Sequence, residues 1–138
     1  MRETQMSEQQ QPKQGRWGGS LDALMGVPGV LAGMVATEEG LPLDARLRSE
    51  LDTDALAAAA AVLGQLGSRT AQAHRGNGLE LVVLDASKYR FMVQPVSLGY
   101  LMAVTDPQIA ADPVASQMAR SAALLNKLAM TIVKPHAA

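Results

Sequence analysis

The feature that constrains the fold most is an uncharged stretch in the middle of the chain, from Ala55 to Ser68. Asp52 or Thr53 can cap a helix before it, and the apolar period predicts one long helix that ends near His74. One face is expected to meet the core and holds Leu56, Ala59, Ala60, Leu63, Leu66, Gly67 and Thr70. The other sides are small rather than charged and hold Ala57, Ala58, Ala61, Val62, Gly64 and Ser68.

The lack of charge on the outer sides indicates that this helix is covered twice, because a helix facing water normally carries Lys and Glu there. A domain of about 120 residues supplies one core, so another protein surface is expected to provide the second cover. We predict a dimer contact that includes Ala57, Ala60, Ala61, Gly64 and Ser68. The alternative is that alanine is used here only because it is the best helix former.

The segments before this helix predict a short helix and a β-hairpin. Ser20 can cap the short helix, which ends at Pro28-Gly29. The apolar run 30–37 predicts a strand covered on both faces, and Glu38-Glu39-Gly40 predicts a hairpin turn. In the next strand Leu41, Leu43, Ala45 and Leu47 are expected to face the core, with Pro42, Asp44, Arg46 and Arg48 facing water. Pro42 favours an edge position for this strand.

The segments after the long helix predict a three-stranded antiparallel meander over 79–85, 89–96 and 100–105. Asp112 and Pro113 then favour the start of a last helix. Its expected buried stripe is Val114, Met118, Ala122, Leu125, Ala129 and Ile132. The order is α-β-β-α-β-β-β-α, which predicts an α+β fold with one five-stranded antiparallel sheet between helices.

Composition excludes most enzyme chemistries. The chain has no Cys, so thiolate nucleophiles, disulfides and cysteine-ligated metals are excluded. Its two histidines, His74 and His136, are too few for a histidine-rich metal site. A net charge of −1 and few aromatic residues argue against nucleic-acid binding. We therefore expect no enzyme activity, no catalytic residue, no cofactor and no metal.

The last helix also carries apolar residues away from its buried stripe. Leu124 and Met130 are therefore a candidate partner surface. Arg69 and Arg120 are cations that can contribute to it, although isolated surface charge is the simpler interpretation of each. We do not interpret either one as an arginine finger.

The order of elements and several short motifs resemble the Roadblock/dynein light-chain family, in particular its bacterial members. The resembling pieces lie between Ser20 and Leu128 and are Leu24 with Val27-Pro28-Gly29-Val30, Glu39-Gly40-Leu41-Pro42-Leu43, the Ala-rich helix, Gly78-Leu79-Glu80-Leu81-Val82-Val83 and Gly99-Tyr100-Leu101-Met102-Ala103-Val104. The resemblance implies a homodimer whose sheets join edge to edge, with the long helices side by side and Leu81 and Val83 on the joining edge. It also implies binding and regulation of a small Ras-like GTPase, as in bacterial gliding motility.

The remaining expectations concern organisation and location. Residues 1–17 are polar and Gln-rich and are expected to form a disordered tail, followed by one domain over 18–135. The N-terminus lacks the apolar core of a signal peptide and no run is long enough to span a membrane, so we expect a cytoplasmic protein. Two other functions stay open: a self-assembling scaffold without a GTPase partner, and a sensor domain for a small ligand.

Overall fold

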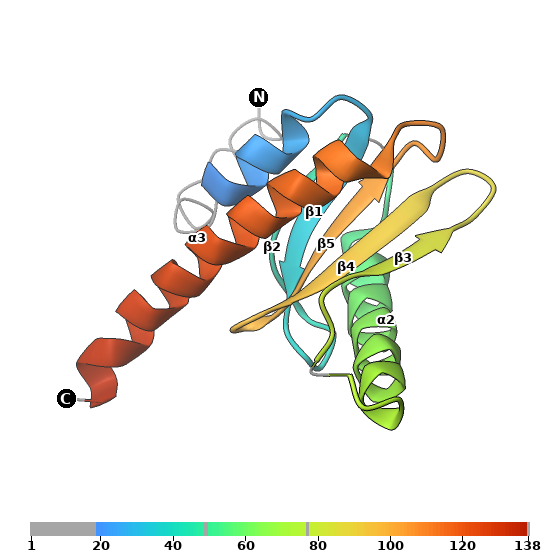
Figure 1. Cartoon of the computed structure of the whole chain (residues 1–138). Coiled ribbons are helices and arrows are strands. Elements are labelled where there is room, and N and C mark those ends of the chain that lie inside the picture. Colours follow the sequence, from blue (N-terminus) through green and yellow to red (C-terminus); the bar gives the residue numbers. More distant parts are fainter. Residues whose placement is uncertain (1–18, 49, 77, 138) are drawn as a thin grey trace, which may run out of the picture.

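The computed structural model describes residues 19–48, 50–76 and 78–137, with side chains described up to residue 131. It confirms the predicted order of elements (Figure 1). A helix over 19–25 is followed by β1 (Val30–Ala36), β2 (Pro42–Leu47), α2 (Thr53–Ala73), β3 (Val82–Asp85), β4 (Arg90–Val96), β5 (Gly99–Thr105) and α3 (Ala111–Ala137). The predicted disordered tail, residues 1–17, lies outside the described residues.

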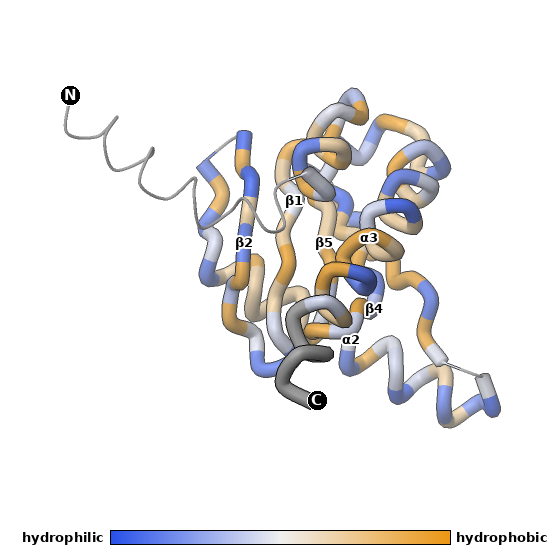
Figure 2. Tube along the Cα trace, turned by 90° about the vertical axis from the view of Figure 1, so that its left-hand side faces the viewer, coloured by the Kyte–Doolittle hydropathy of each residue, from blue (hydrophilic) through white to orange (hydrophobic). Residues whose placement is uncertain are grey.

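The five strands form one antiparallel sheet in the order β2-β1-β5-β4-β3. β1 and β5 therefore lie in the middle, where Gly33 pairs with Ala103 and Met34 with Met102. β2 and β3 form the two edges, which confirms the edge position predicted for the Pro42 strand. In Figure 2, β1 and β5 run through the middle of the domain in largely apolar colours.

Two hydrophobic cores lie on opposite faces of the sheet. The helix over 19–25 and α3 cover one face, and α2 covers the other (Figure 1). The first core includes Leu21, Leu24, Val35, Met92, Leu101 and Met118. The second includes Met34, Leu56, Ala60, Val93, Tyr100 and Met102. The alternation of side chains along β1 and β5 divides their apolar residues between these cores, which explains why both strands are apolar nearly throughout.

The last helix buries the predicted stripe: Val114, Met118, Ala122, Leu125 and Ala129 are all covered. The side chain of Ile132 lies outside the described residues. α3 begins at Ala111, slightly earlier than Asp112 and Pro113 indicate. The Ser121 hydroxyl donates to the carbonyl oxygen of Ser20 at 2.9 Å, and this hydrogen bond ties α3 to the helix over 19–25.

Strand β2 departs from the predicted alternation. Ala45 and Leu47 pack on the α2 core as expected, but Leu41 and Leu43 are exposed and Asp44 is buried. For the two leucines the cause is a bulge: Asp44 pairs with Val35 but Pro42 pairs with Ala36, which leaves Leu43 as an extra residue. The prediction that Leu41 and Leu43 face the core is wrong, because this extra residue breaks the alternation before Asp44. The prediction that Asp44 faces water is also wrong: Asp44 lies opposite to Ala45 as the alternation requires, but the helix over 19–25 covers that face of the sheet.

Asp44 is held by a neighbouring guanidinium group. Its Oδ1 atom accepts hydrogen bonds from Arg46 Nη1 at 3.1 Å and from the Ala45 backbone N–H at 2.8 Å. Arg46 Nε also contacts Asp22 Oδ1 at 3.0 Å, which links β2 to the helix over 19–25. Burial raises the pKa of Asp44, and this effect outweighs the opposing attraction of Arg46.

The raised pKa of Asp44 predicts a pH-dependent stability. The protonated Asp44 contributes to the free energy of unfolding. This contribution is fully present below the pKa of the unfolded chain, 3.8, and is lost as the pH rises through the higher pKa of the folded chain. We expect Asp44→Asn to lack this loss, so its Tm should rise relative to that of the wild type between pH 3 and pH 7. Thermal unfolding followed by circular dichroism measures the Tm of the variant and of the wild type at each pH. A difference in Tm that does not change with pH would contradict the prediction.

Candidate functional site

Helix α2 lies close to the sheet because the side chains beneath it are small. Asp52 caps the helix, accepting from the backbone N–H groups of Asp54 and Ala55 at 3.0 and 3.5 Å. Gly64 lies over the ring of Tyr100, and a Cβ atom at position 64 would be only 2.2 Å from Tyr100 Cε1. The ring thus occupies the space that a larger residue would need. Burial beneath the helix raises the pKa of Tyr100, and Glu38 raises it further.

The orientation of α2 differs from the prediction. Ala57, Ala60, Ala61 and Gly64 are buried against the sheet of their own chain. Leu66 and Thr70, which were expected in the core, are exposed. The helix is therefore rotated relative to the predicted face. Four of the residues predicted to contact a second copy are covered already, and Ser68 is half-buried.

The outer face of α2 is an apolar stripe. Gln65 Nε2 donates to the Glu38 carbonyl oxygen at 2.9 Å, so that flank meets the β1–β2 hairpin. Gly67 lies against Val82 and Leu79, so the other flank meets β3. Between these flanks, Val62 and Leu66 are 64% and 61% exposed. Ala58, one turn earlier, is also exposed. We call Ala58, Val62 and Leu66 the α2 stripe; their spacing of four residues places them on one face.

Strand β3 adds a second apolar surface. It pairs with β4 on one side, and its other side is an edge of the sheet. Val83 and Leu84 are 45% and 42% exposed, and Leu81 just before the strand is half-buried. An exposed apolar edge with unpaired backbone groups can pair with another strand. We call Leu81, Val83 and Leu84 the β3 edge. Sequence reasoning missed Leu84 because it considered one side of the strand.

The four residues predicted as a partner surface lie on two sides of the molecule. Leu124 and Met130 are exposed on α3, and Arg120 on the same helix contacts Gln117 Oε1 at 2.8 Å through Nη2. Arg69 is exposed on α2, across the sheet from the other three. The structure therefore brings Arg120, Leu124 and Met130 onto one helix and does not bring Arg69 to them.

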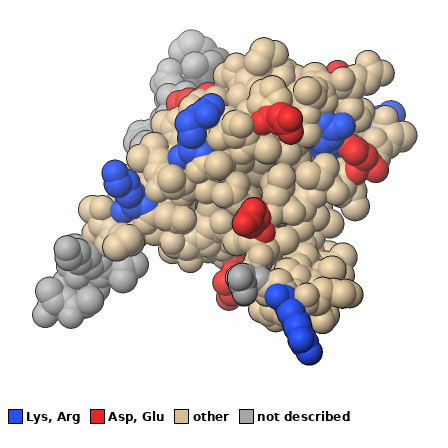
Figure 3. All heavy atoms as spheres, in the orientation of Figure 1, with Lys and Arg blue, Asp and Glu red and all other residues tan. Residues whose placement is uncertain are grey.

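The described part of the chain carries exposed apolar surfaces that could bind another protein. Among these residues, no three His, Cys, Asp or Glu side chains are grouped so that they could hold a metal ion. On the face drawn in Figure 3, the charged side chains are scattered singly or beside a side chain of opposite sign, and most of the surface is uncharged. No helix of the described residues has the length and hydrophobicity to cross a membrane. The α2 stripe and the β3 edge are thus the best candidate site.

Comparison with known proteins places this fold in a family. Residues 20–106 match the model of the Roadblock/LC7 domain. This match spans the chain from the first helix to the end of β5, and the chain therefore belongs to the Roadblock/LC7 family. Helix α3 follows the matched region. No curated protein matches the chain.

Solved structures share the fold at low sequence identity. The Roadblock/LC7 domain from Streptomyces avermitilis is 19% identical, with a TM-score of 0.68 over 85% of this chain and 93% of that one. The gliding protein MglB from Thermus thermophilus is 15% identical, with a TM-score of 0.74 over 86% and 92%. A structure of MglB with tetrameric arrangement is 16% identical, with a TM-score of 0.76 over 86% and 91%. These likenesses establish the architecture.

Proposed function

We propose that this chain is a homodimeric, non-enzymatic interaction module of the cytoplasm that binds and regulates a small Ras-like GTPase. The observation that carries the proposal is the α2 stripe beside the β3 edge, which stays exposed although both cores of the domain are complete. Apolar surface of this kind marks contact with other proteins. The working unit is the domain over 18–135, preceded by the tail over 1–17.

In the proposed dimer, two copies meet through the same surface. A twofold axis places each β3 edge against its counterpart and each α2 stripe against the other. Of the residues predicted from the sequence, Ser68, Leu81 and Val83 keep a role in this contact; Ala58, Val62, Leu66 and Leu84 join them. Pairing of the edges removes a surface that would otherwise favour aggregation. The tetrameric arrangement named for MglB supports self-association in this family.

We place the GTPase contact on α3. Leu124 and Met130 supply exposed apolar surface, and Arg120 lies one turn before Leu124 on the same helix. Arg69 on α2 provides a cation on the opposite side of the sheet. The module is proposed to act by repositioning the partner's own residues, as an activator of hydrolysis or as a scaffold, since neither arginine is assigned to the reaction.

Binding to a purified small Ras-like GTPase from the same genome tests this function. We expect the full chain to retain the GTPase in a pull-down, and to retain more of it in one nucleotide state than in the other when the GTPase is loaded with GDP or with a GTP analogue. Leu124→Asp should weaken binding by about fivefold or more, as loss of an apolar anchor costs at least about 1 kcal/mol. Ser87→Asp, in the exposed β3–β4 turn, is the matched control.

The two alternatives make different predictions in the same experiments. Equal and negligible binding in both nucleotide states, with a stable dimer, would contradict GTPase regulation and favour a self-assembling scaffold. A small molecule retained in the native mass spectrum would favour a ligand sensor.

A further inference from the structure

The two outer strands of the sheet, β2 and β3, differ in the backbone groups that they leave free. In an antiparallel pair every second residue exchanges hydrogen bonds with the neighbouring strand, and the residues between direct their N–H and C=O groups outward. The Arg48 N–H donates to a β1 carbonyl oxygen at 2.8 Å, so Arg46 and Asp44 also direct their backbone groups at β1 in this register. Ala45 and Leu47 therefore direct theirs away from the sheet.

At Ala45 both outward groups are bound by side chains of the same strand. The Ala45 N–H donates to Asp44 Oδ1 at 2.8 Å, and the Ala45 carbonyl oxygen accepts from Arg46 Nη1 at 3.2 Å. The same guanidinium group donates to Asp44 Oδ1 at 3.1 Å and, through Nε, to Asp22 Oδ1 at 3.0 Å. We call Asp44 and Arg46 the β2 cap. A strand that approached β2 would find neither backbone group of Ala45 free.

The β2 cap is difficult to displace. Asp44 is only 5% exposed, and its Oδ2 atom has no hydrogen-bond partner among the residues that the structure describes. If an incoming strand took the Ala45 N–H, a buried carboxyl group would lose one of its few partners, which is costly. Pro42 has no N–H to offer, and the bulge at Leu43 interrupts the register, so the beginning of β2 also opposes pairing.

Strand β3 has no such cap. The Ala86 N–H donates to the Tyr89 carbonyl oxygen at 2.9 Å, so the alternation leaves the backbone groups of Val83 and Asp85 directed outward. The Asp85 carboxylate is held by Arg90 Nε at 2.6 Å. Within the described part of the chain, no side chain binds the outward groups of Val83 or Asp85.

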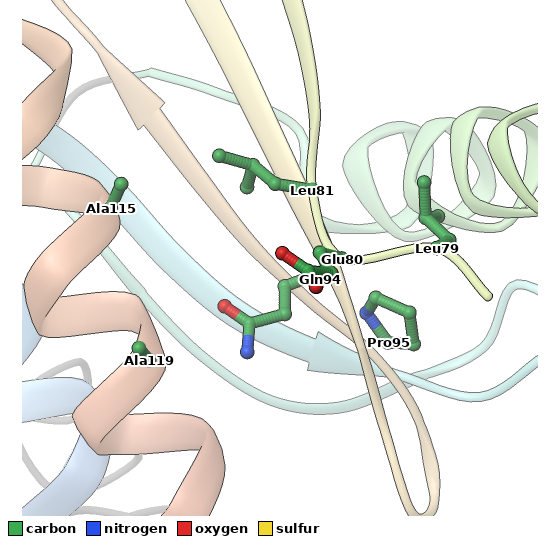
Figure 4. Close-up of a pocket in the computed structure, with 7 residues that line it drawn as sticks. All are labelled: Leu79, Glu80, Leu81, Gln94, Pro95, Ala115 and Ala119. Carbon is green, nitrogen blue, oxygen red and sulfur yellow. The ribbon is translucent and has the colours of Figure 1, made fainter. Parts of the chain in front are cut away.

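The approach to β3 is open on the α3 side as well. The segment 79–81, which leads into β3, lines a groove of about 430 Å³ between the sheet and α3. In Figure 4, Leu81 points toward α3, where only the small side chains of Ala115 and Ala119 face it. A second strand therefore has both free backbone groups and free space at β3, and neither advantage at β2.

We propose that the β2 cap closes its edge to strand pairing, so that sheets of this protein join only through β3 and strand pairing ends at two copies. A sheet that is open at both edges can add copies at each end, and such contacts produce open-ended assemblies. Two copies joined through β3 present a closed β2 at both ends. The number of two rests on the proposed homodimer, whereas the closure of β2 is a property of the single chain.

Removal of the β2 cap tests this proposal in the full chain. Static light scattering over a wide range of concentration should give a constant mass for the wild type. For the double variant Asp44→Ala with Arg46→Ala, the mass should rise with concentration to roughly twice the wild-type value or more, because two assemblies can then join through β2. Arg46→Ala alone should change the mass in the same direction, and it keeps the test available if loss of Asp44 prevents folding.

Two single substitutions serve as matched controls. Asp44→Asn keeps a side-chain oxygen that can accept from the Ala45 N–H, so it should retain the wild-type mass. Arg48→Ala removes a guanidinium group from the same strand, but Arg48 donates to the carbonyl oxygens of Met25 and Val30 and not to Ala45. It should also retain the wild-type mass.

A third substitution locates the new contact. Leu43 on β2 and Leu124 on α3 are similarly exposed, at 41% and 44%. Leu43→Lys added to the double variant should restore the wild-type mass, because lysine on an edge strand opposes pairing. Leu124→Lys in the same background should not.

Circular dichroism verifies that each variant is folded. The proposal is overturned if the folded double variant and Arg46→Ala both keep the wild-type mass, if Asp44→Asn or Arg48→Ala raises the mass, or if Leu43→Lys does not reverse the rise. A wild type that scatters as a single chain contradicts the proposed homodimer alone. Closure of β2 is then supported by a double variant of twice the wild-type mass, and overturned by one of unchanged mass.

Discussion

Leu66→Glu is expected to convert the protein from a dimer to a monomer in solution. The wild type should scatter light as a particle of about twice 14.5 kDa, and the variant as one of about 14.5 kDa. In a twofold dimer each α2 stripe meets its counterpart, so one substitution places two carboxylates in the contact. It also removes two leucine side chains, each contributing about 1.5–3 kcal/mol when fully buried. The two leucines alone account for about 3–6 kcal/mol, which is a large fraction of the roughly 8 kcal/mol of micromolar binding, and repulsion between the carboxylates adds to this loss.

The control for this experiment uses a leucine on another helix. Leu124 on α3 is 44% exposed and lies outside the proposed dimer contact. Leu124→Glu should therefore leave the mass unchanged while introducing the same charge. If the wild type itself scatters as a single chain at micromolar concentration, or if both variants keep the dimer mass, the proposed contact is refuted.

Gly64→Ala is expected to destabilise the folded chain by about 1–3 kcal/mol, the usual cost of overpacking. The added Cβ would lie 2.2 Å from Tyr100 Cε1, so the ring or the helix has to move. The sign of the effect is informative. In an exposed helix position the same substitution stabilises by about 1 kcal/mol, because alanine is the better helix former. Urea unfolding distinguishes the two outcomes.

A double mutant shows whether the ring causes the loss. In a Tyr100→Ala background the space between position 64 and the sheet is larger, and Gly64→Ala should cost less stability than it does in the wild type. A non-zero coupling energy between the two positions is the expected result. Independent effects, or a gain in stability from Gly64→Ala alone, would show that position 64 does not face the sheet.

The order of elements could be predicted from the sequence because each boundary has a local chemical cause. Asp52 accepts hydrogen bonds from the first turn of α2, and Gly40 adopts a φ of +92° in the hairpin turn. Such signals depend on a few adjacent residues. Helix ends and turns were therefore placed within a few residues, and the fold class followed from their order.

The rotation of α2 could not be predicted, because its small side chains give almost no hydrophobic contrast around the helix. The large residues Leu63 and Leu66 then determined the predicted face, although Leu66 points outward. What fixes the rotation is Tyr100, a residue far away in sequence that needs a glycine above it. The pair of glycines at 64 and 67 was the available signal. In β2 the prediction for Leu41 and Leu43 failed because of a single bulge residue, which sequence alternation does not reveal.

Only part of the candidate site could be predicted, because the rotation of α2 could not. The presence of surplus apolar surface on the long helix followed from its lack of charge. Which residues form that surface depends on the rotation and had to come from the structure. The β3 edge was implied by family resemblance, and Val83 is indeed exposed there, while its neighbour Leu84 was not anticipated.

The central pairing of β1 with β5 also determines how the chain reaches its folded state. Gly33 and Ala103 are paired across a long stretch of intervening sequence, whereas the β1–β2 and β3–β4–β5 connections are short. Closing that large loop costs entropy before any contact repays it, so pairing of β1 with β5 is expected to limit the folding rate. During synthesis, the β1–β2 hairpin and α2 emerge before β5, the second of the two central strands. Both cores contain residues of β5, so neither core can be completed until β5 has been synthesised.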